Sequence, residues 1–382
     1  MLRHILAGLA LAALTTAAEA DGLKIGIVAT LSGPAASLGT QLRDGFQLAL
    51  DKSGGKLGGQ PVTLTVIDDE LKPDVAVTRI RAYIDGDKPD IVVGPIFSNI
   101  LQAIFKPVTE SGAILISPNA GASSYAGKAC VKNFFVTSYQ NDQPHAVSGQ
   151  YAQDKGYKRV FLLAPNYQAG RDALEGFKSK FKGEIAGEDY VPLTSMDFQA
   201  EIAKIAAAKP DAVYAFMPGG LGIALVKQYR QAGLASIPFL SAFTVDESTL
   251  PAQGDAAVGF YSGASWAPNM DNALNKDFVA AFEAKYHYVP ASYAAYAYDA
   301  ARLIDAAAKT VGDDHAKLAT AMETADFGSV RGPFKFGVNH YPVQDFYLAQ
   351  VVKRPDGKYE TEIQTKVFSA DVDPYAAQCK MN

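Results

Sequence analysis

The chain has 382 residues, of which 48% are hydrophobic and 20% are charged, and its formal net charge at pH 7 is -5. This length and composition are typical of a globular protein with two domains of ordinary size. The acidic balance, without a dense basic patch, argues against nucleic acid as a partner. The five His and two Cys residues show no metal-ligand spacing, so we expect neither a metal site nor a cofactor.

Residues 1–20 predict a secretory signal peptide. Arg3 and His4 give a short basic start, residues 5–14 are apolar, and Ala18-Glu19-Ala20 is a small-x-small cleavage site. The apolar stretch is too short to span a membrane. We therefore expect an exported, soluble protein whose mature chain begins near Asp21.

The two cysteines, Cys130 and Cys379, are the minimum for one disulfide. An exported compartment permits disulfide formation. We favour a bridge, which would tie the C-terminal tail to a point far up the chain. The alternative is two unrelated free thiols.

Strand and helix patterns alternate along the first part of the chain. Residues 23–30 and 61–68 are apolar strands, and Leu42 and Phe46 mark a helix face between them. Residues 54–59 are glycine-rich and are interpreted as a tight loop, because a phosphate-binding loop would need a strand before it and a helix after it. The alternation of strands and helices predicts a parallel α/β sheet.

The stretch from Asp90 to Ser123 is the most informative part of this series. Two apolar runs, 91–93 and 113–116, each end in small polar residues, and a helical pattern lies between them. Open parallel sheets place ligands beyond the carboxyl ends of their strands, and Ser98 and Asn119 lie at two such ends. Ser98 is also a good cap for the following helix, whose start would attract an anion. The alternative is that Ser98 is a cap and nothing more.

A second strand–helix series runs from about residue 142 to residue 262 and predicts a second parallel α/β unit. Its apolar strands are 158–165, 211–216 and 239–243. Residues 262–268 look like a crossing back to the first unit. Late in the chain, residues 346–368 predict a hairpin around Pro355-Asp356-Gly357, which would add an edge strand to a sheet.

Seven segments follow one another along the chain: KIGIVATLSGPAASLG, GPIFSN, ILISPNAG, FFVTSYQND, LLAPNYQAGRD, AVGFYSG and GPFKFGVNHYPVQDFYLAQV. In their order and spacing they resemble the periplasmic substrate-binding proteins of branched-chain amino-acid-type ABC transporters. The resemblance extends across essentially the whole mature chain. It implies a periplasmic protein with the type I periplasmic binding fold, in which two Rossmann-like lobes with parallel sheets are joined by a three-segment hinge. It also implies membrane permease subunits as partners, and we expect a monomer.

The resemblance implies the division of the chain between the two lobes. Lobe 1 would hold residues 21–138 and 268–340, and lobe 2 would hold residues 139–267 and 341–382. The ligand would lie between the lobes, and closure of the lobes would complete the site. The three crossings would fall near residues 138–140, 265–268 and 340–343.

The family also suggests where each end of a ligand lies. A carboxylate would be held on lobe 1 by two turns, whose residues are Ser98, Asn99, Asn119, Ala120 and Gly121. Amino-acid binders often carry threonine where this chain has Gly121, so one hydroxyl is missing and main-chain N–H groups would act instead. Lobe 2 would contribute Tyr167, Phe243 and the strand end formed by Met217, Pro218 and Gly219. The tyrosines between Tyr286 and Tyr298 have helical spacing and are interpreted as a helix face.

The hypothesis about the ligand rests on the absence of the acidic residue that pairs with a ligand ammonium in amino-acid binders. Amino-acid binders need a carboxylate just after the strand that here ends at residues 241–244, where this chain has Ala242 and Phe243. An ammonium closed between the lobes without a partner would be strongly penalised. We therefore expect a carboxylate ligand without an α-amino group, such as a benzoate or cinnamate derivative. If Asp246 or Glu247 reaches the cleft, a branched-chain amino acid or an amide becomes the expected ligand.

The sequence shows no pattern of catalytic residues that would indicate an enzyme. It has no GxSxG elbow, and its His residues lie outside the strand-end turns where a base would be needed. We expect no catalytic residues. A ligand sensor that signals to a membrane receptor is the remaining alternative to a transport protein.

Overall fold

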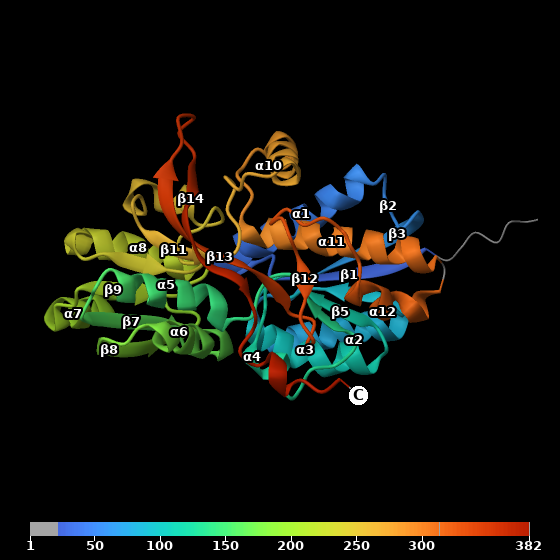
Figure 1. Cartoon of the computed structure of the whole chain (residues 1–382), viewed down its shortest axis with the longest axis horizontal. Coiled ribbons are helices and arrows are strands. Elements are labelled where there is room, and N and C mark those ends of the chain that lie inside the picture. Colours follow the sequence, from blue (N-terminus) through green and yellow to red (C-terminus); the bar gives the residue numbers. More distant parts are fainter. Residues whose placement is uncertain (1–21, 313, 382) are drawn as a thin grey trace, which may run out of the picture.

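The computed structural model describes residues 22–312 and 314–381. The predicted signal peptide lies outside this range. Two α/β units lie side by side, each built on its own sheet, and the long β13–β14 hairpin extends along the second unit (Figure 1). The predicted α/β class with two largely parallel sheets is confirmed.

The first sheet has six strands in the order β2-β3-β1-β4-β5-β6, and its pairs are parallel except β2 with β3. Its central strands are continuous buried apolar runs, because helices cover both faces. The glycine-rich segment predicted as a loop contains β2, which pairs antiparallel with the start of β3. The strands are β1 (Leu23–Ala29), β2 (Lys56–Leu57), β3 (Gln60–Asp68), β4 (Ile91–Val93), β5 (Ile114–Ser117) and β6 (Phe134–Val136).

Helices from both ends of the chain cover the first sheet. Helices α1 and α11 pack against each other on one face, and α2 and α3 pack against each other on the opposite face (Figure 1). The helices of this unit are α1 (Ala36–Lys52), α2 (Pro73–Asp87), α3 (Ser98–Glu110), α4 (Ser123–Ala126), α10 (Ala273–Tyr286), α11 (Ser292–Val311) and α12 (Leu318–Glu323).

The second sheet combines a parallel part with the late antiparallel strands. Its order is β12-β13-β11-β10-β9-β7-β8, and β14 pairs with β13. The predicted late hairpin is confirmed, and β13 joins the sheet antiparallel to β11. The strands are β7 (Arg159–Pro165), β8 (Glu184–Val191), β9 (Ala212–Ala215), β10 (Phe239–Ser241), β11 (Tyr261–Ala264), β12 (Lys335–Phe336), β13 (Pro342–Lys353) and β14 (Tyr359–Asp371).

The helices of the second unit follow its parallel strands in the chain. They are α5 (Asp142–Asp154), α6 (Gln168–Lys180), α7 (Gln199–Ala208), α8 (Gly220–Gln231) and α9 (Leu250–Gln253). Short 3-10 segments occur at Gly33–Ala35, Leu234–Ser236, Gly254–Ala256, His315–Lys317 and Ala376–Gln378.

A buried arginine ties together the segments that connect the two units. The guanidinium of Arg331 pairs with Asp299 of α11 over 2.9 Å. Its Nη1 also donates to Ser138 O over 3.0 Å, after β6, and to Gln344 Oε1 over 2.6 Å, in β13. The connection after β6 and the connection into β13 are therefore fixed to the same helix.

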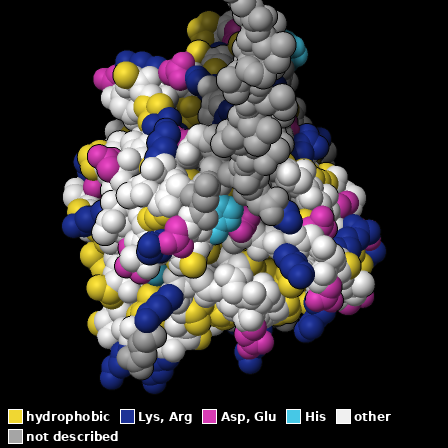
Figure 2. All heavy atoms as spheres, turned by 90° about the vertical axis from the view of Figure 1, so that its right-hand side faces the viewer, with side chains coloured by type: hydrophobic (Ala, Val, Ile, Leu, Met, Phe, Trp, Pro, Cys, Tyr) yellow, Lys and Arg dark blue, Asp and Glu magenta, His cyan; other side chains and the backbone are white. Residues whose placement is uncertain are grey.

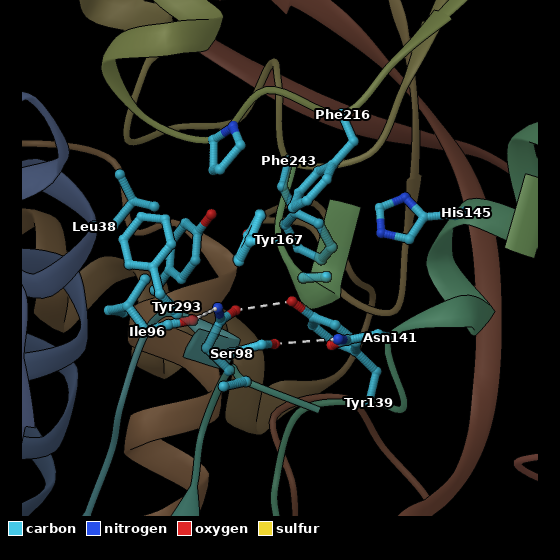
Figure 3. A pocket seen from close by; sticks show the side chains of 15 residues that line it. Leu38, Ile96, Ser98, Tyr139, Asn141, His145, Tyr167, Phe216, Phe243 and Tyr293 are labelled. Atoms are coloured by element: carbon cyan, nitrogen blue, oxygen red, sulfur yellow. Dashed lines mark hydrogen bonds between the residues drawn. The ribbon is translucent and has the colours of Figure 1, made fainter. Parts of the chain in front are cut away.

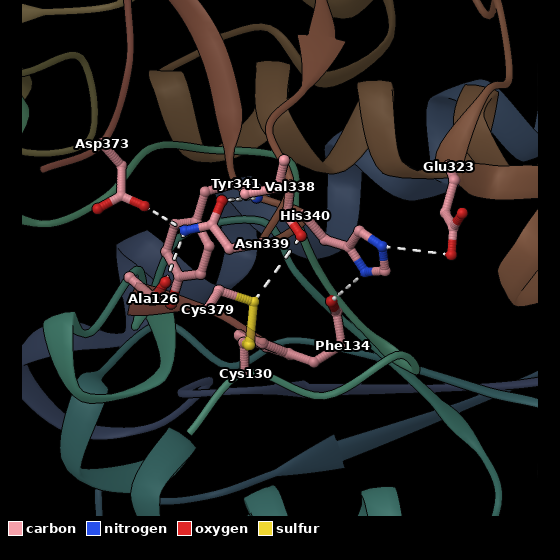
Figure 4. The surroundings of a disulfide bond; sticks show 10 residues. All are labelled: Ala126, Cys130, Phe134, Glu323, Val338, Asn339, His340, Tyr341, Asp373 and Cys379. Atoms are coloured by element: carbon pink, nitrogen blue, oxygen red, sulfur yellow. Dashed lines mark hydrogen bonds and ion pairs between the residues drawn. A yellow bond between two sulfur atoms is a disulfide. The ribbon is translucent and has the colours of Figure 1, made fainter. Parts of the chain in front are cut away.

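The disulfide predicted from the two cysteines is confirmed. Cys130 and Cys379 are bonded, with their Cα atoms 5.7 Å apart (Figure 4). Beside the bridge, the side chain of Asn339 donates to Ala126 O over 2.7 Å and to the carboxylate of Asp373. The tail after β14 is thus bonded to Cys130, in the part of the chain that the predicted division gives to lobe 1.

The surface carries both signs of charge. On the face shown in Figure 2, basic and acidic side chains are interspersed with apolar ones across the described residues. Among the helices of the described residues, none combines the length and the apolar character needed to cross a membrane. Within the same residues, no group of three or more His, Cys, Asp or Glu side chains is arranged to hold a metal ion.

Candidate ligand-binding site

A small pocket lies between the two units, where strands of both sheets reach their carboxyl ends (Figure 3). Its cavity volume is about 20 Å³, which is room for about one water molecule. Side chains therefore fill most of this pocket. The lining residues are Leu38, Ile96, Phe97, Ser98, Asn119, Ala120, Tyr139, Asn141, His145, Tyr167, Ala169, Phe216, Pro218, Phe243 and Tyr293.

The structure brings together most of the residues predicted for a binding site. Those that line the pocket are Ser98, Asn119, Ala120, Tyr167 and Phe243. Those that do not line it are Asn99, Gly121, Met217 and Gly219.

The predicted capping role of Ser98 is wrong. Helix α3 begins at Ser98 itself, with Phe97 at the N-cap position. The Ser98 Oγ accepts a hydrogen bond from Asn141 Nδ2 over 3.2 Å instead of binding a helix N–H (Figure 3). Since this bond uses Ser98 as an acceptor, the proton of its hydroxyl is left to donate into the pocket.

Asn141 is a connector that sequence analysis did not identify. Its Oδ1 accepts from Gly121 N over 3.0 Å, and its Nδ2 donates to Ser98 and to Asp172 Oδ2, the latter over 2.9 Å. The amide thereby joins the segment after β6 to α3 and to α6. All of these groups are buried, and Asn141, itself bonded to Asp172 of α6, positions the Ser98 hydroxyl through one hydrogen bond.

Two helices begin at the pocket, one from each unit. The first main-chain bond of α3 runs from Leu101 N to Phe97 O over 3.0 Å, and that of α6 runs from Arg171 N to Tyr167 O over 3.1 Å. The N–H groups that precede such bonds have no helical carbonyl to bind. The positive ends of two helix dipoles therefore meet at this pocket, which favours an anion there.

The side-chain amide of Asn119 is hydrogen-bonded within the protein at both its nitrogen and its oxygen. Its Nδ2 donates to Ile96 O over 2.6 Å, and its Oδ1 accepts from the Tyr139 hydroxyl over 2.9 Å. The N–H of Ala120 points to Pro95 O at 3.5 Å. Together with the bond from Gly121 N to Asn141, this leaves the turn with fewer free main-chain donors than the sequence suggested.

Gly121 has a steric role. A Cβ atom built at this position would lie 1.9 Å from the carbonyl oxygen of Tyr139. The Gly121 carbonyl also accepts from Asn141 N over 2.8 Å. Glycine, in place of the threonine of amino-acid binders, allows this close approach of the two backbones.

Three other predicted residues lie beside the pocket. Met217 is fully buried in the core of the second unit, and its N–H donates to Thr244 Oγ1 over 2.9 Å. Gly219 has φ 63° and lets α8 start close to α1, since a Cβ there would lie 2.9 Å from Leu38 Cδ1. Asn99 is the second residue of α3, and its buried Oδ1 has no hydrogen-bond partner among the described residues.

Aromatic rings form much of the pocket wall. Phe243 stacks on Tyr139 with ring centres 4.9 Å apart, and its centre lies 6.2 Å from that of Tyr293. Tyr167 lies between Phe97 at 6.2 Å and Phe216 at 6.3 Å. Phe243 has φ 58°, a conformation that costs a non-glycine residue free energy and often occurs at functional sites.

Two lining residues were not predicted for the site, and one of them, Tyr293, contradicts the sequence-based interpretation. Tyr293 was assigned to a helix face away from the ligand, yet it is the second residue of α11 and lines the pocket. His145 lies on α5, outside the strand-end turns, and also lines the pocket. Burial lowers the pKa of His145 to about 3, so the ring is neutral, and its Nδ1 hydrogen bonds with the hydroxyl of Tyr214.

Neither acid that could have reached the cleft lines it. Glu247 is directed to β14, where its Oε1 accepts from Thr361 N and Oγ1, both over 2.7 Å. Asp246 is buried, and its Oδ1 accepts from Ser248 N over 2.8 Å. The residues that line the pocket in the described chain include no Asp, Glu, Lys or Arg.

Comparison with known proteins agrees with this architecture. A family model described as periplasmic binding protein matches residues 22–358. A Leu/Ile/Val-binding protein homolog of Brucella melitensis is 29% identical over 375 residues, which cover 94% of this chain and 95% of the relative.

Solved structures show the same fold. A solute-binding protein of an ABC transporter from R. palustris, in complex with benzoate, is 35% identical with a TM-score of 0.89, covering 94% of this chain and 100% of that one. A solute-binding protein from Rhodopseudomonas palustris BisB5, in complex with 3,4-dihydroxybenzoic acid, is 29% identical with a TM-score of 0.86, covering 92% of this chain and 98% of that one. The fold is thus the type I periplasmic binding fold, and the family consists of binding proteins rather than enzymes. The chain belongs to the periplasmic binding protein family.

Proposed function

We propose that this protein is the periplasmic solute-binding component of an ABC importer and that its ligand is a small aromatic carboxylate. The observation that carries the proposal is the composition of the pocket wall. Rings and hydroxyl groups line it, and within the described residues no charged side chain does so. The solved relatives whose complexes contain benzoate and 3,4-dihydroxybenzoic acid support the same ligand class.

The negative end of the ligand would lie at the starts of α3 and α6. The Ser98 hydroxyl, held by Asn141, would donate to a carboxylate oxygen. The free N–H groups of the first turn of α3 would supply further donors. A carboxylate there replaces its water shell with fixed dipoles, which is the condition for closing a charge inside a cleft.

The ring would pack among Tyr139, Tyr167 and Phe243. Offset or edge-to-face packing of aromatic rings contributes about 0.5–1.5 kcal/mol per pair beyond the area buried. The cavity volume of about 20 Å³ is far below the roughly 300 Å³ of ordinary ligand pockets. The two units would therefore separate to admit the ring and close again around it.

An α-amino acid fits this pocket poorly. Its ammonium is attached to the carbon next to the carboxylate, so an acid would have to stand close to Ser98. The lining residues of the described chain offer none, and an unpaired buried ammonium is costly. The Brucella relative carries a Leu/Ile/Val-binding name, which makes leucine the comparison ligand in any test.

Closure would link binding to transport. We propose that residues 21–138 with 268–340 and residues 139–267 with 341–382 move as two lobes, apart from the tail bonded at Cys130, and that the protein acts as a monomer. A ligand shifts the open–closed equilibrium only by binding one state better, and hinge closure around a ligand is an established mode of change. Contacts of the ligand with both lobes would make its affinity for the closed state higher than for the open state. Membrane permease subunits would then bind the closed form.

Isothermal titration calorimetry of the mature protein tests the proposal. Benzoate, 4-hydroxybenzoate and cinnamate are titrated beside leucine and a short aliphatic amide. Binding of at least one aromatic acid, without heat from leucine, is the expected result. Binding of leucine without binding of any aromatic acid would refute the proposed ligand class and restore the amino-acid function.

A further inference from the structure

Asp246 has a carboxylate oxygen without a partner in the protein interior. The residue is 6% exposed and lies in the loop between β10 and α9. Its Oδ1 accepts from the N–H and the hydroxyl of Ser248. Its Oδ2 has no hydrogen-bond partner among the described residues. A buried acceptor that lacks a donor destabilises the protein unless a ligand or water supplies one.

The carboxylate is adjacent to the pocket. It follows the pocket residue Phe243 by three positions, and the hydroxyl of Tyr293, another pocket residue, lies close enough to lower the pKa of the carboxyl, without a hydrogen bond of normal geometry to its Oδ2. Burial raises the pKa of Tyr293, and the Asp246 charge adds to that rise. The same two causes, with neighbouring tyrosines, raise the pKa of Tyr139. Burial raises the pKa of Asp246 itself to about 6, so its carboxylate is negative above that pH, behind the side chains that line the pocket.

The two ends of the pocket differ in charge. Ser98 and the start of α3 belong to the first unit and attract an anion. Asp246 follows β10 of the second unit and repels one. A ligand carboxylate would therefore be favoured at Ser98, with the opposite end of the ligand toward Asp246.

We infer that Asp246 Oδ2 is the acceptor that selects aromatic carboxylates bearing a hydrogen-bond donor, a hydroxyl or an amino group, at the end of the ring remote from the carboxylate. This inference rests on the proposed function. It adds the specificity of the site: a ring without a donor leaves Oδ2 unpaired, whereas a ring with one completes its hydrogen bonding. An α-ammonium cannot take this place, because it lies at the carboxylate end of its molecule.

Calorimetry with matched ligands and variants tests the inference. The ligands are 4-hydroxybenzoate and 4-aminobenzoate, which carry the donor, and benzoate and 4-methylbenzoate, which lack it. The proteins are the wild type, Asp246→Asn and the control Glu247→Gln. The control removes the neighbouring buried acid, which is bonded to Thr361 and not to the pocket. We expect 4-hydroxybenzoate to bind the wild type and the control about tenfold or more tightly than 4-methylbenzoate.

In Asp246→Asn that preference should shrink to within about threefold, because the new amide presents a donor where an acceptor stood, while the affinity for benzoate changes little. If Asp246 had a purely structural role, the substitution would weaken the binding of all four ligands alike.

Equal affinity of the wild type for 4-hydroxybenzoate and 4-methylbenzoate would overturn the inference, and this comparison needs no variant to fold. Persistence of the preference in Asp246→Asn would overturn it as well. In both cases, binding of benzoate would still support the proposed function. The proposed function fails only if no aromatic acid binds.

Discussion

The Nδ2 of Asn141 donates a hydrogen bond to the Oγ of Ser98 over 3.2 Å, between the segment that follows β6 and the first turn of α3. The bond makes Ser98 an acceptor within the protein and so frees its proton for a ligand. It also explains why this serine is not a helix cap. A hydroxyl whose oxygen already accepts a bond at a helix start has its proton available for an anion.

Replacing Ser98 should weaken the binding of an aromatic acid. The variant Ser98→Ala removes the one hydroxyl donor at the carboxylate end, and hydrogen bonds to charged groups contribute about 1.5–3 kcal/mol. We expect the dissociation constant for benzoate, measured by calorimetry, to rise by about 10-fold to 100-fold. The matched control is Ser111→Ala at the far end of α3, where the hydroxyl binds Val108 O. Unchanged affinity in Ser98→Ala would show that the carboxylate binds elsewhere.

Replacing Gly121 by the threonine that amino-acid binders often carry should destabilise this protein. In Gly121→Thr a Cβ would lie 1.9 Å from Tyr139 O, so the turn or the segment after β6 must shift. Overpacking of this kind costs about 1–3 kcal/mol, and the melting temperature should fall. The control Gly86→Ala, on helix α2 with open space around it, should be neutral or stabilising. A Gly121→Thr protein as stable as the wild type would contradict the close approach.

The buried acid Glu247 should make the stability of the protein dependent on pH. Burial, together with the charge of Asp246, raises its pKa from 4.5 to about 8. Between these values the folded protein holds a proton that the unfolded chain releases, so the free energy of unfolding falls as pH rises from about 4.5 to about 8. The decrease is on the order of 5 kcal/mol for this single group.

Urea unfolding across this pH range measures the effect. In Glu247→Gln the bonds from Thr361 can persist while the titration is lost, so the stability curve should be flatter than that of the wild type. The exposed Glu110→Gln should leave the curve unchanged. Equal slopes for the wild type and Glu247→Gln would show that Glu247 titrates normally.

The disulfide should stabilise the protein without contributing to ligand binding. It closes a loop of 249 residues, and removal of such a bridge costs about 2–5 kcal/mol. We expect the double variant Cys130→Ser with Cys379→Ser to melt at lower temperature and to bind benzoate with unchanged affinity. Dithiothreitol should lower the melting temperature of the wild type alone. A similar drop in the double variant would mean that the reductant acts elsewhere.

The sequence predicted pocket residues best at the carboxyl ends of the parallel strands, where position along the chain indicates position in the fold. Ser98 and Asn119 were identified because parallel strands end at one edge of their sheet, whereas Tyr167 and Phe243 were placed by the family resemblance. Met217 does not line the pocket because neighbouring side chains at a strand end point to opposite faces: Phe216 and Pro218 line the pocket, and Met217 enters the core.

Several of the pocket residues that sequence reasoning missed lie on helices, whereas Asn141 follows β6 and Phe97 precedes α3. Leu38, His145 and Tyr293 reach the pocket only through the way α1, α5 and α11 are placed by the packing of the two units. Helical spacing marks an apolar face but does not say which end of that face meets the other unit. For Tyr293, a usable signal was its position at the start of α11, since helix starts gather at the cleft in this fold.

A crystal structure of the protein with benzoate tests the central claim most directly, because it locates the carboxylate. The account predicts the carboxylate within hydrogen-bond distance of Ser98 Oγ and the first N–H groups of α3, with the ring between Tyr139, Tyr167 and Phe243. A complex in which the carboxylate lies away from the start of α3, or in which only an amino acid binds with its ammonium paired to Asp246, would contradict it.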